Sequence, residues 1–522
     1  MPHFTELLSQ SAARARGLWS HKPEEVVRNL QAAAKLQVSV EYRTRQEELH
    51  EFYLGRHLDH MKRVIRAVLP QEAERLISSL GGLDAMDLVS MITRDLSVVF
   101  HREPETDLVN TDTGEALAED HPDRALWKAD RASVLLGPTL RQVDAYTTLF
   151  RTCPVQVAWV DDGVTDPHVQ WIAHPAYRCH VNQSLANPLS AQAAHSVHIE
   201  LPSAVHSATG SQPARMLSWF RLAGADGGNE WHYLVHDENG HTDRSMMTLS
   251  ADPADTSNPY ALHPIAVFRD ELPERGHFFG PWREAWWLRQ RQVNLQLVDL
   301  VNICRHQGFS LLVAEGAENF PQEQTISPGA RIDVLTGGTL RYVTSSPNID
   351  MLENVLENGL RRMAIIEGLP SDHWTYLGGV RNLGALKMTR ERKKLRQRAN
   401  IPLYDVAMRE LWRAHKAVAN EHRSQRYDDT TGLRVIYPEL PEVVDEFQHT
   451  QSLDRRLAYN LTNPVAEIAR ERGVSTEEAE RIAADNLTRN AELSRLVSAG
   501  EPAAPAAAAA GDGVQRPSDV QG

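Results

Sequence analysis

A long stretch without glycine, residues 385–423, constrains the fold of this chain more than any other feature. Pro402 is its only helix breaker. At about 1.5 Å of rise per residue, about forty residues predict a helix of roughly 60 Å. Because proline lacks a backbone N–H, we expect a kink at Pro402. Apolar spacing in the second half predicts one buried stripe, made of Leu403, Val406, Ala407, Leu411, Ala414 and Val418.

The first half of this predicted helix carries seven basic side chains between residues 387 and 398, in a chain of net charge −14. Closely spaced like charges repel one another unless acids from elsewhere or phosphates compensate them. The run is either a solvated helix face or a surface that faces phosphates or a neighbouring subunit, since a second acidic copy is a ready source of carboxylates. The candidate residues of that surface are Lys387, Arg390, Lys393, Lys394 and Arg396.

The segment before the helix, 368–384, is a loop rich in glycine and aromatic residues. Its end, 379–387, comes near to a phosphate-binding P-loop. However, the lysine stands two residues late, no serine or threonine follows it, and no strand precedes it. We therefore expect no nucleotide site and interpret the segment as a mobile loop that ends where the helix begins.

Composition narrows the classes of protein that this chain can belong to. With 42% hydrophobic and 24% charged residues, the 522-residue chain is typical of a globular protein with several domains. We expect no secretory signal and no membrane-spanning helix, because no long apolar run occurs. Cys153, Cys179 and Cys304 are few and far apart, as in a reducing compartment. The acidic balance argues against a nucleic-acid binder that wraps its target with its whole surface.

The spacing of polar residues does not indicate a metal centre. The nearest group of possible ligands is His174, Cys179, His180, His195 and His198. Cys179 and His180 are adjacent, so on a strand they face opposite ways, and no paired cysteine spacing supports a zinc site. A nucleophile elbow and a dinucleotide fingerprint are also missing from the sequence. We expect ordinary strand and loop histidines and no cofactor.

Periodicity divides the chain before the loop into a helical part, a β-rich part and two helices around an insert. Helices are expected at 46–58, 60–69, 72–80, 85–99, 127–136 and 140–150. Strands are expected at 155–160, 169–173, 215–220, 231–235 and 265–268, with a hairpin turn at 239–240 that leads into 246–249. Helices at 282–307 and 348–367 are expected to flank a strand at 309–314 and a small β-like insert at 320–347.

After the long helix, 432–437 is predicted to be a lone strand whose partner we expect in the β-rich part. Residues 451–496 form a predicted helical unit. In it, Asn463 caps a helix that begins at Pro464, and 475–478 is a capping box. The alanine- and proline-rich end, 501–522, is predicted to be disordered.

The order of these parts resembles the portal proteins of tailed bacteriophages. In that family an α/β wing leads into a stem helix, a clip, a second stem helix, a tunnel loop, and a long helix that crosses the wing to a helical crown. The segments that carry the resemblance open the long helix, precede the first stem helix and lie in the C-terminal helical unit. They are 384–387, 258–268, and 463–468 with 473–479.

The resemblance implies an α+β portal fold with an α/β wing, a two-helix stem, a small β-containing clip, a long kinked helix and an α-helical crown. The implied parts are an N-terminal arm (1–22), a wing (23–280, helical to about 150 and β-rich after it), a first stem helix (281–308), a clip (309–347), a second stem helix (348–367), a tunnel loop (368–384), the long helix (385–424), a returning wing strand (425–446), a crown (447–498) and a disordered tail (499–522).

The resemblance also implies a role without catalysis, as a homo-oligomeric ring at one capsid vertex. The ring is dodecameric in the family, and double-stranded DNA is packaged and ejected through it. The implied partners are the terminase large subunit as packaging motor, a head-completion or adaptor protein, and the major capsid and scaffolding proteins. Such a protein is made in the host bacterial cytoplasm, acts in the virion and involves no membrane. The alternative is a nucleic-acid-processing enzyme that uses the basic helix as a substrate track.

Within this resemblance the tunnel loop lines the DNA channel. Backbone freedom at the two glycines lets such a loop shift as DNA passes. Trp374 and Tyr376 are too large to be left in solvent, so we expect them to pack on a neighbouring subunit or to meet the DNA. Arg381 is expected to pair with a carboxylate of the adjacent subunit. The candidate channel residues are Asp372, His373, Trp374, Tyr376, Gly378, Gly379 and Arg381.

Overall fold

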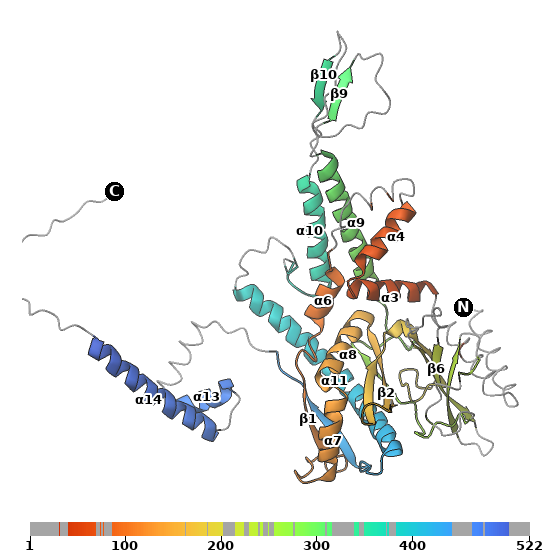
Figure 1. Cartoon of the computed structure of the whole chain (residues 1–522), viewed down its shortest axis with the longest axis vertical. Helices are drawn as coiled ribbons and strands as arrows, with labels where there is room; N and C mark the ends of the chain where they lie inside the picture. The colour runs from red at the N-terminus through yellow and green to blue at the C-terminus, as the bar shows by residue number, and fades with distance from the viewer. Residues whose placement is uncertain are drawn as a thin grey trace, which may run out of the picture. The chain divides into compact units, whose positions relative to one another are not determined.

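The chain falls into two compact units, which divide after Pro441 (Figure 1). The computed structural model describes residues 31, 40–68, 74, 77, 86–161, 163–184, 186–201, 215–223, 229–237, 241–243, 249, 255–274, 277–307, 311–315, 339–343, 349–371, 373–374, 383–440, 462–472 and 476–500.

Helices open the first unit, as predicted. They are α3 (Val40–Tyr53), α4 (His57–Val68) and α6 (Leu88–Leu96). α6 begins where the Asp87 carboxylate accepts a hydrogen bond from the Ser90 N–H at 3.2 Å, which satisfies one of the free amides of the first turn. The helix expected at 72–80 falls mostly outside the described residues.

The next strand, β1 (Glu105–Asn110), was not predicted. It pairs antiparallel with β11 (Thr431–Ile436), so the strand expected at 432–437 is confirmed. The expectation that its partner lies in the β-rich part is wrong. β1 escapes sequence analysis because Leu108 is its only buried residue, so the strand lacks apolar alternation.

Two helices then lead into the sheets. They are α7 (Pro122–Ser133) and α8 (Leu136–Phe150), close to the two helices expected at 127–136 and 140–150. Pro122 stands in the first turn of α7, where its missing N–H removes no intrahelical bond. The break between the helices is at Leu135, whose φ of 49° is left-handed.

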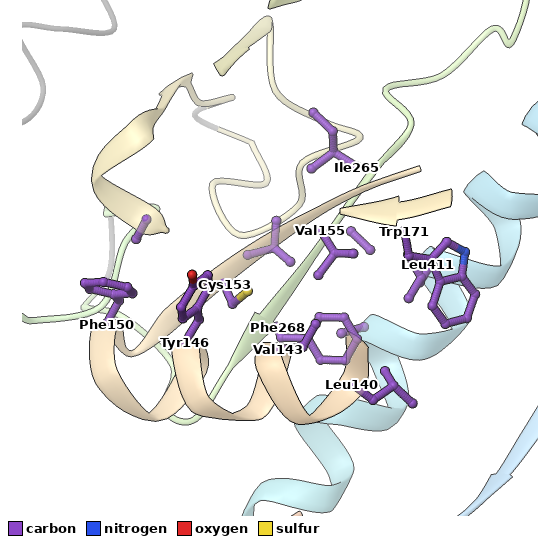
Figure 2. Close-up of a cluster of buried hydrophobic side chains, with 14 of the residues drawn as sticks. Leu140, Val143, Tyr146, Phe150, Cys153, Val155, Trp171, Ile265, Phe268 and Leu411 are labelled. Atoms are coloured by element: carbon purple, nitrogen blue, oxygen red, sulfur yellow. The ribbon is translucent and has the colours of Figure 1, made fainter. Parts of the chain in front are cut away.

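A three-stranded antiparallel sheet forms the centre of the first unit. Its order is β3 (His168–Ala173), β2 (Thr152–Val160) and β8 (Ile265–Arg269), which confirms three predicted strands. Side chains of α8 meet this sheet, and Figure 2 shows Leu140, Val143 and Tyr146 beside Cys153 and Phe268. Burying each large side chain contributes roughly 1.5–3 kcal/mol.

A second antiparallel sheet has four strands. Its order is β4 (Cys179–Asn182), β5 (Ser196–Leu201), β6 (Arg215–Ala223) and β7 (Asn229–Asp237). β6 and β7 confirm the strands expected at 215–220 and 231–235, whereas β4 and β5 were not predicted. The expected turn at 239–240 lies outside the described residues, as does nearly all of the strand expected at 246–249.

Two long helices follow and run side by side (Figure 1). They are α9 (Glu284–Gln307) and α10 (Ile349–Ile366), as predicted. Between them in sequence, β9 (Leu311–Glu315) pairs antiparallel with β10 (Thr339–Val343), which confirms the strand expected at 309–314. The remainder of the insert, 316–338, lies outside the described residues.

The predicted long helix is α11 (Leu383–His422), which has 40 residues and contains Pro402. It packs against β8 and β2. Leu411, Ala414 and Val418 are buried as predicted, but Val406 is exposed. The buried stripe instead includes Tyr404 and Met408, because the helix turns a slightly different face to the sheet than the aliphatic residues alone indicate. A kink at Pro402 stays a prediction.

The second unit contains α13 (Pro464–Arg472) and α14 (Thr476–Gly500), which pack on each other. The Asn463 side chain accepts a hydrogen bond from the Ala466 N–H at 2.6 Å, so the predicted N-cap is confirmed. Ser475 and the chain end from 501 lie outside the described residues. Mixed helix and antiparallel sheet confirm the α+β class.

Candidate functional site: the base of the helix pair

The loop that follows α10 begins with a tight helix stop. Gly368 has a left-handed φ of +73°, its N–H donates to the Ile365 carbonyl at 2.9 Å, and the Leu369 N–H donates to the Ala364 carbonyl at 2.8 Å. This pair of bonds is a Schellman motif, in which glycine avoids the strain of a Cβ. Leu369 is buried beside it, so the chain leaves α10 in one fixed direction.

A buried group of charged side chains joins the base of the helix pair to the sheet and to α11. We call it the basal ion cluster, and its members are Arg151, Asp270, Arg283, Glu367 and Arg396. Arg283 lies 3.0 Å from Asp270 and 3.3 Å from Glu367. Arg151 lies 3.3 Å from Asp270, and Arg396 of α11 lies 3.7 Å from each carboxylate.

The basal ion cluster connects five elements that are far apart in sequence. Arg151 follows α8, Asp270 follows β8, Arg283 precedes α9, Glu367 follows α10, and Arg396 lies in α11. Burial raises the pKa of Asp270 and lowers the pKa of Arg283 to about 10, while their mutual attraction opposes both shifts. Breaking a buried pair leaves an uncompensated charge and costs about 3–5 kcal/mol. The cluster therefore fixes the helix pair relative to the sheet.

The start of the loop is docked on α6 and α11. The His373 Nε2–H donates to the Asp95 carboxylate at 2.5 Å, and Lys393 forms an ion pair with the same carboxylate. Arg392 donates to the Gly368 carbonyl. Burial opposes the ionisation of Asp95, but the His373 hydrogen bond and the Lys393 charge outweigh it and hold the pKa of Asp95 below its usual value.

The basic run of α11 is therefore partly neutralised within the chain. Lys393 and Arg396 face the acids described above, and Lys394 lies 3.6 Å from Glu391 on the same helix. Lys387 is exposed and Arg390 is half-buried. Whether these side chains also meet phosphates or a second subunit stays a prediction.

Of the predicted channel residues, only His373 and Trp374 lie within the described residues. Asp372, Tyr376, Gly378, Gly379 and Arg381 lie outside them. Trp374 is only 7% exposed and belongs to the apolar core of its own chain, whereas its expected packing on a neighbour or on DNA stays a prediction. The sequence analysis did not consider that the same chain could bury this tryptophan.

Two further buried carboxylates anchor α11, and sequence analysis did not single them out. Asp144 of α8 accepts hydrogen bonds from the Val99 N–H at 2.9 Å, the Phe100 N–H at 3.0 Å and the Tyr404 hydroxyl at 2.8 Å. The position of this aspartate among the apolar residues of α8 could have identified it as a buried acceptor.

Asp130 of α7 holds the C-terminal end of α11. It accepts hydrogen bonds from His415 at 2.9 Å, from Arg423 at 2.9 Å and from the Tyr427 hydroxyl at 2.7 Å. The other ring nitrogen of His415 accepts from the Trp171 indole at 3.2 Å. The two ends of the buried half of α11 are thus fixed by separate polar networks.

The histidines considered as metal ligands have ordinary partners. His180 lies 2.6 Å from Glu200, His174 lies 3.1 Å from Gln156, and His198 contacts the hydroxyls of Ser196 and Ser218. Among the residues that the structure describes, no three His, Cys, Asp or Glu side chains gather as a metal-binding group. Within the same residues, no helix is both long and apolar enough to cross a bilayer.

Large apolar side chains are exposed along the helix pair and along α11. Ile365 and Ile366, at the end of α10, are 61% and 66% exposed, and Leu395 of α11 is 62% exposed. The others on these three helices are Leu288, Met351, Val355, Met388 and Val406. Single exposed apolar side chains are common on protein surfaces, but several along one pair of packed helices are candidates for contacts with other molecules.

No protein-family model matches the chain, and no curated protein matches its sequence. A chain from the virion of a native gene transfer agent particle is 11% identical, aligns with 78% of this chain and 94% of its own, and has a TM-score of 0.39. A chain from the neck of an empty gene transfer agent particle, computed with C6 symmetry, is 12% identical, covers 74% and 88%, and has a TM-score of 0.32. At such TM-scores neither similarity establishes a shared fold or function.

Proposed function

We propose that this protein is a phage-type portal protein, which assembles as a ring and forms the passage for double-stranded DNA at one capsid vertex. The observation that carries the proposal is the exposed apolar surface of α9, α10 and α11. A single chain leaves these side chains in water, whereas neighbouring copies of the same helices in a ring would bury them.

The basal ion cluster suits a helix pair that bears load. In the proposed ring, α9 and α10 are the stem and the insert between them is the clip. The cluster ties both stem helices to the sheet and to α11, so force on the stem is passed to the rest of the subunit. Buried charges lock such geometry because every alternative arrangement leaves one of them unpaired.

The charge of the chain also suits a passage for DNA. A channel that must release its cargo cannot bind phosphate strongly, and each copy carries a net charge of −14. The loop 368–384 and its residues Asp372, Tyr376, Gly378, Gly379 and Arg381 are proposed to approach the channel. His373 and Trp374 would serve as the fixed base of that loop, since both are buried.

The proposed partners follow from this role. The insert between α9 and α10 would contact the terminase large subunit during packaging and an adaptor protein afterwards. The major capsid and scaffolding proteins would surround the ring, and the ring itself would be dodecameric.

Negative-stain microscopy and mass photometry of the purified full-length chain test the proposal. We expect closed rings of uniform diameter. A double substitution, Ile365→Glu with Ile366→Glu, places charges on the exposed apolar surface and should shift the protein to monomers with unchanged far-UV circular dichroism.

A matched control puts the same charge on a different exposed apolar residue. Val164, in the turn between β2 and β3, is 89% exposed, and Val164→Glu should leave the rings intact. A wild-type protein that stays monomeric at micromolar concentration in low and moderate salt would contradict the proposed function.

The alternative, an enzyme that tracks nucleic acid along the basic helix, has less support. Arg392, Lys393 and Arg396 are occupied by acceptors of the same chain, which removes much of the positive surface such a track requires.

A further inference from the structure

The first helix of the pair, α9, has an edge that its own contacts leave uncovered. Trp286 is buried, and Gln290 faces α6, where its side chain accepts a hydrogen bond from the Val89 N–H at 2.9 Å. An α-helix turns about 100° per residue, so Leu288 lies about 200° around α9 from Trp286 and about 160° from Gln290. Leu288 therefore points away from both contacts, and it is 43% exposed. We call this side of the helix the α9 edge.

The second helix has a matching edge. Leu360, Met363 and Ala364 are buried along the side of α10 that packs on α9. Ile365 lies about 200° around α10 from Met363, and it is 61% exposed. Asn358, about two turns earlier on the same side, is also exposed. This side is the α10 edge. Because the buried sides of the two helices face each other, the two edges lie at opposite sides of the pair.

The two edges stand at similar heights along the pair. At the base, Arg283 lies 3.3 Å from Glu367. Further along, a Cβ at Gly359 would lie 2.6 Å from the Arg289 Nη1, so the arginine crosses α10 at this glycine. These two contacts align the antiparallel helices and place Leu288 within about one helical turn of the height of Ile365. In a ring whose axis follows the helices, neighbouring subunits share the same height, so the α9 edge of one copy comes level with the α10 edge of the next.

The α10 edge carries positive charge that its own chain does not neutralise. Arg362 is exposed there, and Arg289 comes close to it across Gly359. Burial and the charge of Arg362 lower the pKa of Arg289. In the part of the chain that the structure describes, neither arginine forms an ion pair, whereas Arg361 is paired with Glu357 at 3.1 Å. Like charges this close repel each other, so they favour an acid supplied from outside the subunit.

The α9 edge offers such an acid. Glu284 stands about one turn before Leu288 on the same edge, and its side chain is 54% exposed. It lies 3.3 Å from Arg45, which is also paired with Glu41. An exposed ion pair of this kind contributes about 0–1 kcal/mol, and a carboxylate accepts at both of its oxygens. Glu284 can therefore take a second cation without losing the first.

We propose that the α10 edge of each subunit packs on the α9 edge of the next one, with Ile365 against Leu288 and Arg362 beside Glu284. The inference rests on the proposed ring and specifies which surfaces of two copies meet. A second copy is the occupant because the edges agree in height, in apolar character and in sign of charge. The contact is heterologous, so every subunit uses both edges and the assembly can close into a ring.

A two-fold contact fits the same edges poorly. Two α10 edges face to face would bring Arg289 and Arg362 of both copies together, and two α9 edges would bring together two copies of Glu284. Like charges that meet at a contact destabilise it. A DNA phosphate would satisfy the arginines, but it offers no apolar partner to Ile365 or Leu288.

Oppositely charged substitutions at the two edges test the contact. Leu288→Glu alone and Ile365→Lys alone should each raise the subunit concentration at half-dissociation at least roughly tenfold, because each places a charge against an apolar side chain of the next subunit. Both substitutions in one chain should restore the ring. The two positions lie on opposite edges, so the new carboxylate and ammonium groups can meet only between subunits. Sedimentation velocity over a range of protein concentrations measures the dissociation.

Mixing the two single variants gives a second, independent test. An equimolar mixture should form rings in which the variants alternate, because every contact then joins either two unchanged edges or two edges of opposite charge. Leu54→Glu is the matched control, since Leu54 follows α3 and is 48% exposed, and it should leave the wild-type rings intact. Far-UV circular dichroism and the melting temperature of each variant report on its fold.

The possible outcomes separate this contact from the ring itself. If wild-type rings form and Leu288→Glu dissociates like wild type, the α9 edge is not in the interface and the proposal is wrong while the ring stands. If the double variant and the mixture remain monomeric with native circular dichroism, the two edges do not face each other. If Arg362→Ala leaves ring dissociation unchanged but abolishes binding of a labelled DNA duplex in fluorescence anisotropy, the arginines take phosphate and the proposal is overturned. If wild-type protein forms no rings, the proposed function itself fails.

Discussion

The indole Nε1 of Trp286 donates a 2.7 Å hydrogen bond to the carboxylate of Glu367, which joins the first turn of α9 to the residue that follows α10. The Arg283 guanidinium lies over the Trp286 ring at 4.3 Å and also faces Glu367. One carboxylate thus holds both helices of the pair and, through Arg396, the long helix. This relationship leads to the first of four predictions.

Glu367→Gln should lower the free energy of unfolding by about 3–5 kcal/mol, because it leaves the buried Arg283 without one of its two carboxylates. Urea denaturation followed by circular dichroism measures the change. Glu271→Gln removes an acid that lies 2.7 Å from Arg151 but is 55% exposed, and it should cost no more than about 1 kcal/mol. Equal losses in the two variants would contradict the assigned role of burial.

Asp144→Asn should change how stability depends on pH. Burial raises the pKa of Asp144 from 3.8 to about 6, against the hydrogen bonds from Phe100, Tyr404 and Val99. The unfolded chain therefore releases this proton first, so the site lowers stability as pH rises from about 4 to about 6. Two pKa units correspond to about 3 kcal/mol. Between about pH 4 and about pH 6, the free energy of unfolding of the wild type should therefore fall by about this amount relative to that of the variant. Above this range the difference between the two proteins should stay constant.

Asp130→Asn should act in the opposite direction. Burial alone would raise the pKa of Asp130, but hydrogen bonds from His415, Arg423 and Tyr427 outweigh it and depress that pKa. The stabilising contribution of this carboxylate is present above its unfolded pKa and is lost as pH falls through the folded one. The variant should be less stable than wild type at neutral pH, and the gap should narrow in acid. A difference in stability that does not change with pH would show that Asp130 is not ionised in this network.

Trp374→Ala should destabilise the monomer by about 3–5 kcal/mol, because this side chain is 7% exposed within its own chain. Tyr376→Ala is the comparison from the same loop. If Trp374→Ala keeps full stability while packaged DNA is reduced, the docked conformation is not the one that acts, and Trp374 meets the DNA after all.

Patterned segments are the part of the fold that sequence analysis predicted well. The apolar and helix-forming residues of 282–307, 348–367 and 385–423 specify their helices locally, because spacing and propensity agree in each of them. No strand was predicted at β1, because apolar and polar residues alternate only weakly along it. Pairing with β11 makes this segment a strand.

The functional residues were harder to predict. The sequence analysis noticed the basic run on α11 but not the acids that pair with it. Those pairs depend on where Asp95, Asp270 and Glu367 lie in space, and each of them comes from a different part of the chain.

Local sequence therefore specifies the elements of this protein: a long helix with its proline, a helix pair around an insert, strands rich in β-branched residues, and the cap at Asn463. Local spacing and backbone chemistry are enough for these features. Which charges meet depends instead on the packing of the whole first unit. Asp95, Asp130, Asp144, Asp270 and Glu367 look like ordinary acids along the chain, and they become buried acceptors only when distant elements pack around them. The same packing buries Trp374, because burial depends on all the elements that surround a side chain.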